Sequence, residues 1–469
     1  MKTRFSILMA ALALAACSVG DTYVKPEAKP PAAWKNATTT AAWPSADWWR
    51  RFGSLRLDEL MRQAQADNFD LAIAIAKVRQ ADAQASIAGA GLLPSLSGSA
   101  GATRSRGSMA SSSLSSSSTR VAKPVYSSSY NTLASASYEV DFWGKNTATL
   151  ASAEALAQAS RFDQQTVMLT VQSSIANTYF EVLSLQERVR LARENIRNAD
   201  SVLAVFRDRQ QFGTATSLDV AQQESVVAGL RAATPPLEQQ MRQDFNALAI
   251  LTGRLPEELL LVPETLEAVS VPVVAAGLPS ELLGRRPDVQ SAEASLRSAN
   301  ADIAVARAAW FPSISLTGQG GFQSLDLAKM MTHAAMLWSV GPTLSVPIFD
   351  GGKIAGTVEQ KRGRYEELAQ TYRKAVASAF SDVENALIAV EKTAEEVEAQ
   401  RVNEATAHRA FDIAQVQLQG GVADITSVLN TQKTLFAAQD SLTQARLAHL
   451  QAVVGLYKAL GGGWAVAAP

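Results

Sequence analysis

The sequence is poor in the residues that form disulfides and metal sites. Its 469 residues include one cysteine, Cys17, and three histidines, His333, His408 and His449. A single cysteine excludes an intrachain disulfide, and three scattered histidines form no ligand cluster for zinc or iron. We therefore expect no metal, no cofactor and no catalytic residues, and we expect that the protein is not an enzyme.

Excess charge and long apolar runs are also missing. The chain has 43 Lys and Arg against 44 Asp and Glu, a formal net charge of −1. It therefore has no positive excess to neutralise a phosphate backbone, and we expect no nucleic-acid partner. Beyond the N-terminus, no stretch reaches the roughly 18 consecutive apolar residues of a transmembrane helix. If the chain crosses a membrane, the remaining route is a β-barrel.

The N-terminus has the pattern of an export signal. Lys2 and Arg4 precede an apolar run at 5–16, about twelve residues long, which is typical of a signal-peptide core. Small residues lead directly into Cys17, and this pattern resembles the lipobox of bacterial lipoproteins. The resemblance implies cleavage before Cys17, a covalent lipid on Cys17 and, because Ser18 follows, sorting to the outer membrane. The alternative is ordinary cleavage that leaves an unused cysteine.

The rest of the chain contains an internal duplication. Residues 93–97 (LPSLS) recur as 311–315 (FPSIS) at an offset of 218. Glycines 144, 213 and 253 recur as glycines 352, 421 and 461 at an offset of 208. The change in offset indicates an insertion in the first copy, which we assign to the serine-rich tract 105–119, an expected exterior loop.

The duplication divides the chain into six segments. In order they are the signal peptide 1–16, an acylated extended segment 17–56, a first repeat 57–253, a linker 254–284, a second repeat 285–461 and a C-terminal tail 462–469.

Each repeat has the same expected order of elements: a helix, two strands and a long helical hairpin. The opening helices are expected at 57–88 and 287–309, and alternation at period two predicts strands over 132–142, 314–322 and 338–348. Strands of about ten residues with aromatic residues near their ends suit a tilted crossing of a bilayer. A soluble sandwich with one wet face is the alternative.

The strands of one chain are too few to close a barrel. A closed barrel needs about eight or more strands, and an open edge in lipid leaves backbone groups unpaired at several kcal/mol each. Two strands in each repeat therefore predict that several identical chains pool their strands.

The helical hairpins are unusually long. Residues 146–212 contain no glycine or proline, and as a helix they extend roughly 100 Å. Residues at heptad spacing predict a coiled-coil seam. The seam positions are Ile175, Thr178, Val182, Leu185, Val189, Ala192, Ile196, Ala199, Leu203 and Phe206, repeated in the second copy by Val383, Val390, Val397 and Phe411.

Glycine and proline mark the ends of these helices. Gly213 and Gly420-Gly421 can supply left-handed backbone geometry for the two turns, and the returning helices are expected to end at Gly253 and Gly461. Pro235-Pro236 predicts a break or a kink in the first returning helix.

Five motifs in this order make the chain resemble the outer-membrane efflux proteins, the TolC-like channels of tripartite pumps, in the lipoprotein branch called NodT or OprM-like. They are Trp48-Trp49-Arg50-Arg51-Phe52, Asp141-Phe142-Trp143-Gly144-Lys145, Leu278-Pro279-Ser280-Glu281-Leu282-Leu283, Arg285-Arg286-Pro287-Asp288 and Phe311-Pro312-Ser313-Ile314. The resemblance covers nearly the whole mature chain. It implies a membrane α+β fold: a homotrimer with four strands per subunit in one twelve-stranded β-barrel, continued by a long α-helical coiled-coil barrel across the periplasm.

The resemblance also implies a function. The chain would be a passive exit duct for drugs or other small toxic compounds, lipid-anchored in the outer membrane and extending into the periplasm. Its partners would be a periplasmic adaptor, an inner-membrane RND-type transporter and outer-membrane lipid. A conduit for type I protein secretion is one alternative, and a structural coiled coil without a pore is another.

The expected gate lies at the periplasmic coiled-coil tips, which would open on contact with the adaptor. Charged rings are a common means of controlling cation access to a pore, and Asp219 and Asp424 are the candidates at the tips. Asn430 stands where relatives often have an aspartate. The alternative for both aspartates is a solvated charge at the start of a helix.

Overall fold

A computed structural model describes residues 20–27, 30–35, 43–106, 126–259, 264–420, 422 and 425–464. The helices and strands, in chain order, are η1 (Trp48–Phe52), α2 (Leu55–Asp67), α3 (Phe69–Ala90), β1 (Ser95–Arg106), β2 (Tyr126–Val140), α4 (Lys145–Gln211), α5 (Ser217–Leu251), η2 (Pro256–Glu258), η3 (Leu266–Ala268), α6 (Pro279–Arg285), α7 (Pro287–Ala308), β3 (Ser313–Ser324), η4 (Leu327–Lys329), η5 (His333–Ala335), β4 (Met336–Ser345), α8 (Lys353–Gln419) and α9 (Ile425–Ala459).

The chain divides into two compact units, each built from both repeats. The strand unit comprises the described parts of 1–25, 79–158 and 294–370. The hairpin unit comprises those of 26–78, 159–293 and 371–469. The long helices α4 and α8 contribute one end to each unit.

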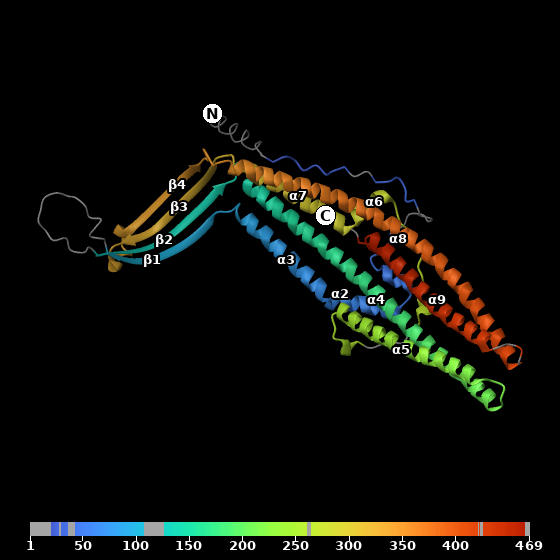
Figure 1. Cartoon of the computed structure of the whole chain (residues 1–469). Helices are drawn as coiled ribbons and strands as arrows, with labels where there is room; N and C mark the ends of the chain where they lie inside the picture. The colour runs from blue at the N-terminus through green and yellow to red at the C-terminus, as the bar shows by residue number, and fades with distance from the viewer. Residues whose placement is uncertain are drawn as a thin grey trace, which may run out of the picture. The chain divides into compact units, whose positions relative to one another are not determined.

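The strand unit contains one antiparallel sheet in the order β1-β2-β3-β4 (Figure 1). β2 of the first repeat pairs with β3 of the second, with Ala134 opposite Gly320. On β4, the large apolar side chains of Trp338, Val340 and Leu344 alternate along the strand and are exposed. The expected strands are therefore confirmed, and one stripe of the sheet is apolar.

Two strands end earlier than the alternation predicts, because the next residues cap a helix. β2 ends at Val140, and the Asp141 carboxylate accepts the backbone N–H groups of Asn146 and Thr147 at 2.9 and 2.8 Å. β4 ends at Ser345, and Asp350 likewise accepts the N–H of Ile354 at 2.7 Å. Each carboxylate satisfies donors that the first turn of α4 or α8 leaves free.

The helices of the strand unit are joined by a polar cluster around Asp302 on α7. Asp302 accepts a hydrogen bond from Ser152 of α4 at 2.7 Å and pairs with Lys361 of α8 at 2.6 Å. Ser298, also on α7, contacts the same Ser152 hydroxyl at 2.9 Å. These contacts place α7 between α4 and α8.

The hairpin unit contains two antiparallel helix pairs, α4 with α5 and α8 with α9 (Figure 1). We call them hairpin 1 and hairpin 2. The heptad seam is confirmed, since Ile175, Leu185, Ala199 and Phe206 are buried. Near the tips, both hairpins contribute to one apolar cluster that includes Leu203, Phe206 and Phe411.

Farther from the tips, the N-terminal segment enters a larger core. Trp48 stacks on Tyr457 with ring centroids 4.9 Å apart, and Phe52 lies 5.1 Å from Phe180. Trp48 and Phe52 are fully buried against α4 and α9. The aromatic motif at 48–52 therefore attaches the segment before the first repeat to the hairpin unit.

Two predictions about helix continuity need correction. The helix expected over 57–88 is two helices, α2 and α3, separated at Asn68, whose extended backbone ends α2 while its side chain accepts the N–H of Leu71 at 2.9 Å. Of the break or kink expected at Pro235-Pro236, the break is absent, because α5 runs through both prolines. Both prolines are exposed, as are Arg231 and Ala232 one turn earlier, so the carbonyl groups that lose their partners are not buried.

None of the helices within the described ranges combines the length and apolar character needed to cross a membrane.

Candidate functional site: the hairpin tips and the Arg286 junction

The turn of hairpin 1 is built on Gly213. This residue has φ of 73°, in the left-handed region, as predicted. The N–H of Gly213 bonds to the carbonyl of Gln210 at 3.0 Å, and the N–H of Thr214 bonds to the carbonyl of Arg209 at 2.8 Å. This pair of bonds is the Schellman motif, which closes a helix end and reverses the chain.

Asp219 lies in the first turn of α5 and caps that helix. Its carboxylate accepts the backbone N–H of Thr216 at 2.6 Å and the Thr216 hydroxyl at 2.7 Å, while its own N–H bonds back to that hydroxyl at 3.3 Å. This is a capping box at an exposed turn. The geometry supplies a structural reason for the carboxylate, and a role for Asp219 in the gate stays a prediction.

The tip of hairpin 2 is described only in part. The N–H of Gly420 bonds to the carbonyl of Val416, and the N–H of Val422 bonds to that of Gln417 at 2.9 Å. Gly421 and Asp424 lie outside the described residues, so their predicted roles have no geometry here. Asn430 lies in the second turn of α9 with an exposed side chain.

Both tips expose apolar side chains. Phe212 and Leu218 flank the turn of hairpin 1, and Val422 lies in the turn of hairpin 2; all three are at least 65% exposed. The guanidinium of Arg209 donates to the carbonyl of Leu418, which ties the end of α4 to the end of α8. Sequence reasoning missed this contact, because nothing in the pattern distinguishes Arg209 from other surface arginines.

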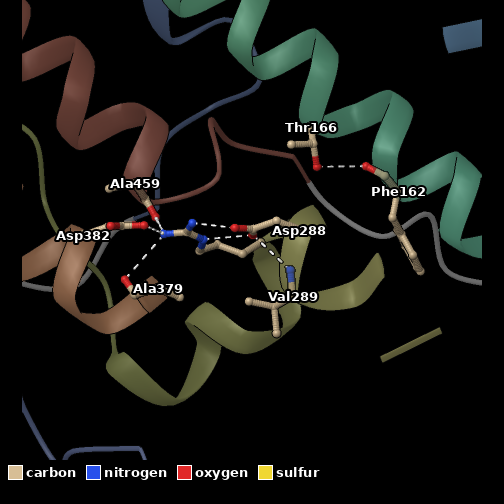
Figure 2. A network of polar contacts seen from close by, with 8 residues as sticks. Phe162, Thr166, Asp288, Val289, Ala379, Asp382 and Ala459 are labelled. Carbon is tan, nitrogen blue, oxygen red and sulfur yellow. Dashed lines mark hydrogen bonds and ion pairs between the residues drawn. The ribbon is translucent and has the colours of Figure 1, made fainter. Parts of the chain in front are cut away.

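A second polar site lies where α6 meets α7, around Arg286. Figure 2 shows Asp288, Asp382 and Ala459 gathered at this site. Arg286 Nε and Nη2 donate to the two carboxylate oxygens of Asp288 at 3.0 and 2.6 Å. Arg286 Nη1 donates to Asp382 of α8 at 2.9 Å and to the carbonyl of Ala459 at the end of α9 at 3.4 Å. One guanidinium therefore joins three segments of the second repeat.

Arg286 is mostly buried, and burial by itself would lower its pKa. The hydrogen bonds and charges of Asp288 and Asp382 outweigh burial and raise the pKa. The side chain therefore stays positively charged, and its planar guanidinium can donate to both carboxylates. Its role is to hold the segments together, not to take part in proton transfer.

The first repeat has a neutral version of this junction. Asn68 corresponds to Arg286 at the offset of 218, and its amide donates to the carbonyl of Leu251 at 2.7 Å. Leu251 corresponds to Ala459 at the offset of 208, so the same contact occurs in both repeats. The duplication is thus preserved at the level of single hydrogen bonds.

The remaining candidates of the sequence lie apart from these sites. His408 contacts Asp412 one turn away at 2.8 Å, His449 contacts Thr393 at 2.9 Å, and His333 is exposed. Within the described ranges, no group of three or more His, Cys, Asp or Glu side chains could hold a metal ion. Cys17 lies outside the described residues, so its lipidation stays a prediction.

Known proteins resemble this chain over nearly its full length. A family model described as "Outer membrane efflux protein" matches residues 60–254 and 278–462. The chain is 41% identical over 464 residues to the pyoverdine export outer membrane protein OpmQ of Pseudomonas aeruginosa, covering 98% of this chain and 96% of the relative. It is 30% identical to the probable efflux pump outer membrane protein TtgC of Pseudomonas putida, covering 99% and 96%.

Solved structures show the same fold. The Campylobacter jejuni CmeC outer membrane channel matches with a TM-score of 0.88 and 25% identity, covering 97% of this chain and 96% of that one. The open state of the Neisseria gonorrhoeae MtrE outer membrane channel matches with a TM-score of 0.84 and 28% identity, covering 95% and 98%. The fold class expected from the sequence is thereby confirmed.

Proposed function

Because this chain belongs to the outer membrane efflux protein family, it is an outer-membrane channel of a tripartite efflux pump that extends into the periplasm, and we propose how it assembles, opens and is anchored. The observation that carries the function is the match of both repeats to the family model, together with a strand sheet and two long hairpins in one chain. Purified protein in a planar bilayer should conduct ions. A complete lack of conductance, also in variants with truncated tips, would contradict a channel.

The proposed assembly is a homotrimer that shares one pore. In the sheet order β1-β2-β3-β4, β1 and β4 each pair on one side only. An unpaired edge is costly in lipid, so β1 of one copy pairs with β4 of the next. Light scattering in detergent should give the mass of three chains.

The proposed gate is formed by the tips of the two hairpins. Two packings that differ by a few kcal/mol, with the adaptor favouring the open one, are sufficient for such a gate. Apolar side chains exposed at the turns, such as Phe212 and Val422, offer contact area to a periplasmic adaptor. The inner-membrane partner in this proposal is an RND-type transporter, which supplies the energy, while this subunit is a passive duct with no catalytic residue and no cofactor.

Asp219 and Asp424 test the gate directly. The double change Asp219→Ala and Asp424→Ala should alter single-channel conductance or block by divalent cations. Thr216→Ala is the matched control, because it removes the hydroxyl of the capping box and keeps the carboxylate. If the double variant and the control both conduct like the wild type, the aspartates have no part in the gate. An equal change in both would assign the effect to the helix cap.

The proposed cargo is small molecules, and a secreted siderophore is the first candidate. Two relatives, 41% and 38% identical over at least 98% of this chain, are named pyoverdine export outer membrane proteins. A deletion strain should lose export of its siderophore or become sensitive to antibiotics, dyes or metals. A deletion strain that instead loses only a secreted protein would favour type I secretion.

The proposed anchor is a lipid on Cys17, supported by the small residues that precede it. Mass spectrometry of the mature N-terminus tests it, since unmodified Cys17 or cleavage at another bond would contradict the proposal.

A further inference from the structure

One face of the sheet is apolar along most of its length and basic at one end. The three registers pair even-numbered positions with even-numbered positions, so these side chains share one face of all four strands. Leu96 and Leu344 lie on it, and we call it the apolar face. Within the described strands, its only charged side chains are Arg104 and Arg106 of β1. Glu139 of β2 is at an odd position and therefore lies on the opposite face.

The two arginines lie at the end of the strands that is farther from the helices. β1 begins at Ser95 shortly after α3, and β2 ends at Val140 shortly before α4. Arg106 pairs with Tyr126 at the opposite ends of these two strands. Because the strands cross the outer membrane and the rest of the channel extends into the periplasm, the Arg106 end of the sheet is the one at the cell exterior.

The length of β2 places the arginines at the outer boundary of the bilayer. Ser128 is opposite Arg104 and lies twelve residues from Val140. At about 3.3 Å per residue and a tilt of about 40°, these residues span roughly 30 Å along the membrane normal, whereas the apolar band of a barrel is about 25 Å tall. Arg104 and Arg106 therefore lie at the depth of the lipid headgroups, where an arginine on the lipid-facing side is tolerated.

The two guanidinium groups share one aromatic ring. The Cζ atoms of Arg104 and Arg106 lie 5.7 and 5.9 Å from the centre of the Tyr126 ring, within the range of a cation–π contact. Both arginines are exposed, and Tyr126 is 59% exposed. Among the described residues, no carboxylate pairs with either guanidinium. The N–H groups of both arginines are therefore available to an anionic ligand.

We propose that Arg104, Arg106 and Tyr126, which we call the arginine platform, bind the phosphate groups of lipopolysaccharide. This glycolipid occupies the outer leaflet of an outer membrane, and the sugars next to its acyl chains carry phosphates at the depth of the platform. A guanidinium donates several N–H groups to phosphate oxygens, and the acyl chains of the same molecule lie against the apolar face. The inference rests on the outer-membrane channel of the proposed function and adds a lipid partner to it.

Three double variants of the full-length protein test the platform. Arg104→Gln with Arg106→Gln removes both cations. Arg104→Lys with Arg106→Lys keeps both charges and loses the planar groups of donors. Arg197→Gln with Arg409→Gln is the matched control, because it removes two exposed arginines from the parts of α4 and α8 that belong to the hairpin unit.

Native mass spectrometry of the detergent-solubilised protein counts bound lipids as one of three probes is added. The probes are diphosphoryl lipid A, which is the membrane-embedded part of lipopolysaccharide, dephosphorylated lipid A and phosphatidylglycerol. We expect the wild type and the control to bind diphosphoryl lipid A most tightly. The Gln double variant should lose about tenfold or more of that affinity, because charged hydrogen bonds to phosphate are lost, and the Lys double variant should fall between.

Two results would overturn the platform. One is equal affinity of the wild type for diphosphoryl and dephosphorylated lipid A, which needs no variant to fold. The other is equal affinity of the wild type and the Gln double variant for diphosphoryl lipid A. Tighter binding of phosphatidylglycerol by the wild type would assign the surface to a phospholipid and overturn the proposal for lipopolysaccharide. Conductance of the wild type in a phospholipid bilayer tests the channel separately, so a conducting protein without a preference for phosphorylated lipid A overturns the platform alone.

Discussion

Arg286 shows how one residue distinguishes two otherwise duplicated halves. Its counterpart Asn68 makes one side-chain contact to the end of the neighbouring hairpin, at Leu251, whereas Arg286 reaches the end of α9 and also holds Asp382 of α8. The residue that corresponds to Asp382 in the first repeat is Ser174, which has no charge. Hairpin 2 is therefore attached to its junction by charged hydrogen bonds, and hairpin 1 by neutral ones.

Replacing Arg286 should therefore destabilise the hairpin unit. Arg286→Ala removes charged hydrogen bonds and should lower the free energy of unfolding by about 1 to 3 kcal/mol, because the two remaining carboxylates are partly exposed and can be hydrated. Arg286→Lys keeps the charge but loses the several N–H donors of the guanidinium, so its free energy of unfolding should lie between those of the wild type and Arg286→Ala. Thermal unfolding of the detergent-solubilised protein, followed by circular dichroism, measures this order. Equal midpoints for wild type and Arg286→Ala would show that the network is dispensable.

His449 gives a prediction about pH. The ring is half buried beside Thr393, and burial lowers the pKa of His449 below its usual value of about 6.5. The unfolded chain then binds a proton more readily than the folded chain, so this group reduces stability as the pH falls through about 6.5. His449→Gln should lose less stability than wild type between pH 7.5 and pH 5.5. An identical loss in both proteins would exclude His449 as a contributor.

At the scale of elements, helix ends recur more faithfully than helix surfaces. α4, α5 and α9 each end in the same pair of backbone bonds around Gly213, Gly253 and Gly461. α4 and α8 each begin at an aspartate that caps the first turn. The heptad seams also recur, but the outward faces of α4 and α8 differ. The outward face of α4 contacts α9 of the other hairpin, whereas the corresponding positions of α8 are exposed.

Gly461 provides a sharp test at this scale. Its φ is 87°, and a Cβ atom there would lie 2.3 Å from the carbonyl oxygen of Arg285. Gly461→Ala should therefore cost about 2 kcal/mol or more, or prevent assembly. Gly455→Ala is the control, because a Cβ at this helical site meets nothing within 4 Å and alanine favours a helix by up to about 1 kcal/mol. Yield of folded oligomer and unfolding midpoint should separate the two variants, and a tolerated Gly461→Ala would refute the packing described for this turn.

At the scale of the whole molecule, the sheet supplies the membrane-facing surface without help from a lipid. Leu96, Trp338, Val340 and Leu344 expose large apolar side chains on the strands. Because burying such strands in lipid involves every subunit, the sheet can hold the protein in the bilayer independently of the lipid proposed for Cys17.

Cys17→Ser should therefore remove the lipid proposed for Cys17 and leave the trimer and its conductance intact. Metabolic labelling with a fatty acid measures the first effect, and light scattering with bilayer recordings measures the second. Loss of conductance in a Cys17→Ser protein that is still trimeric would show that the lipid has a part in the channel itself.

The sequence by itself determined the local structure of this protein. Strand alternation, heptads and the glycine at 213 depend on contacts close along the chain, so period and residue type were sufficient to predict them. The duplication and the ordered motifs also gave the family, because each copy keeps the same glycines at one offset. The end of β2 before Asp141 and the split at Asn68 were missed, because a capping side chain competes with periodicity over only a few residues.

Only the tertiary structure decided which surfaces meet. The contact of Arg286 with Asp382, the tie from Arg209 to Leu418 and the pairing of β2 with β3 join residues 96, 209 and about 190 positions apart. Nothing in the local pattern of a surface arginine specifies such a partner, because the free energy of the contact depends on burial and geometry that exist only after the chain has folded.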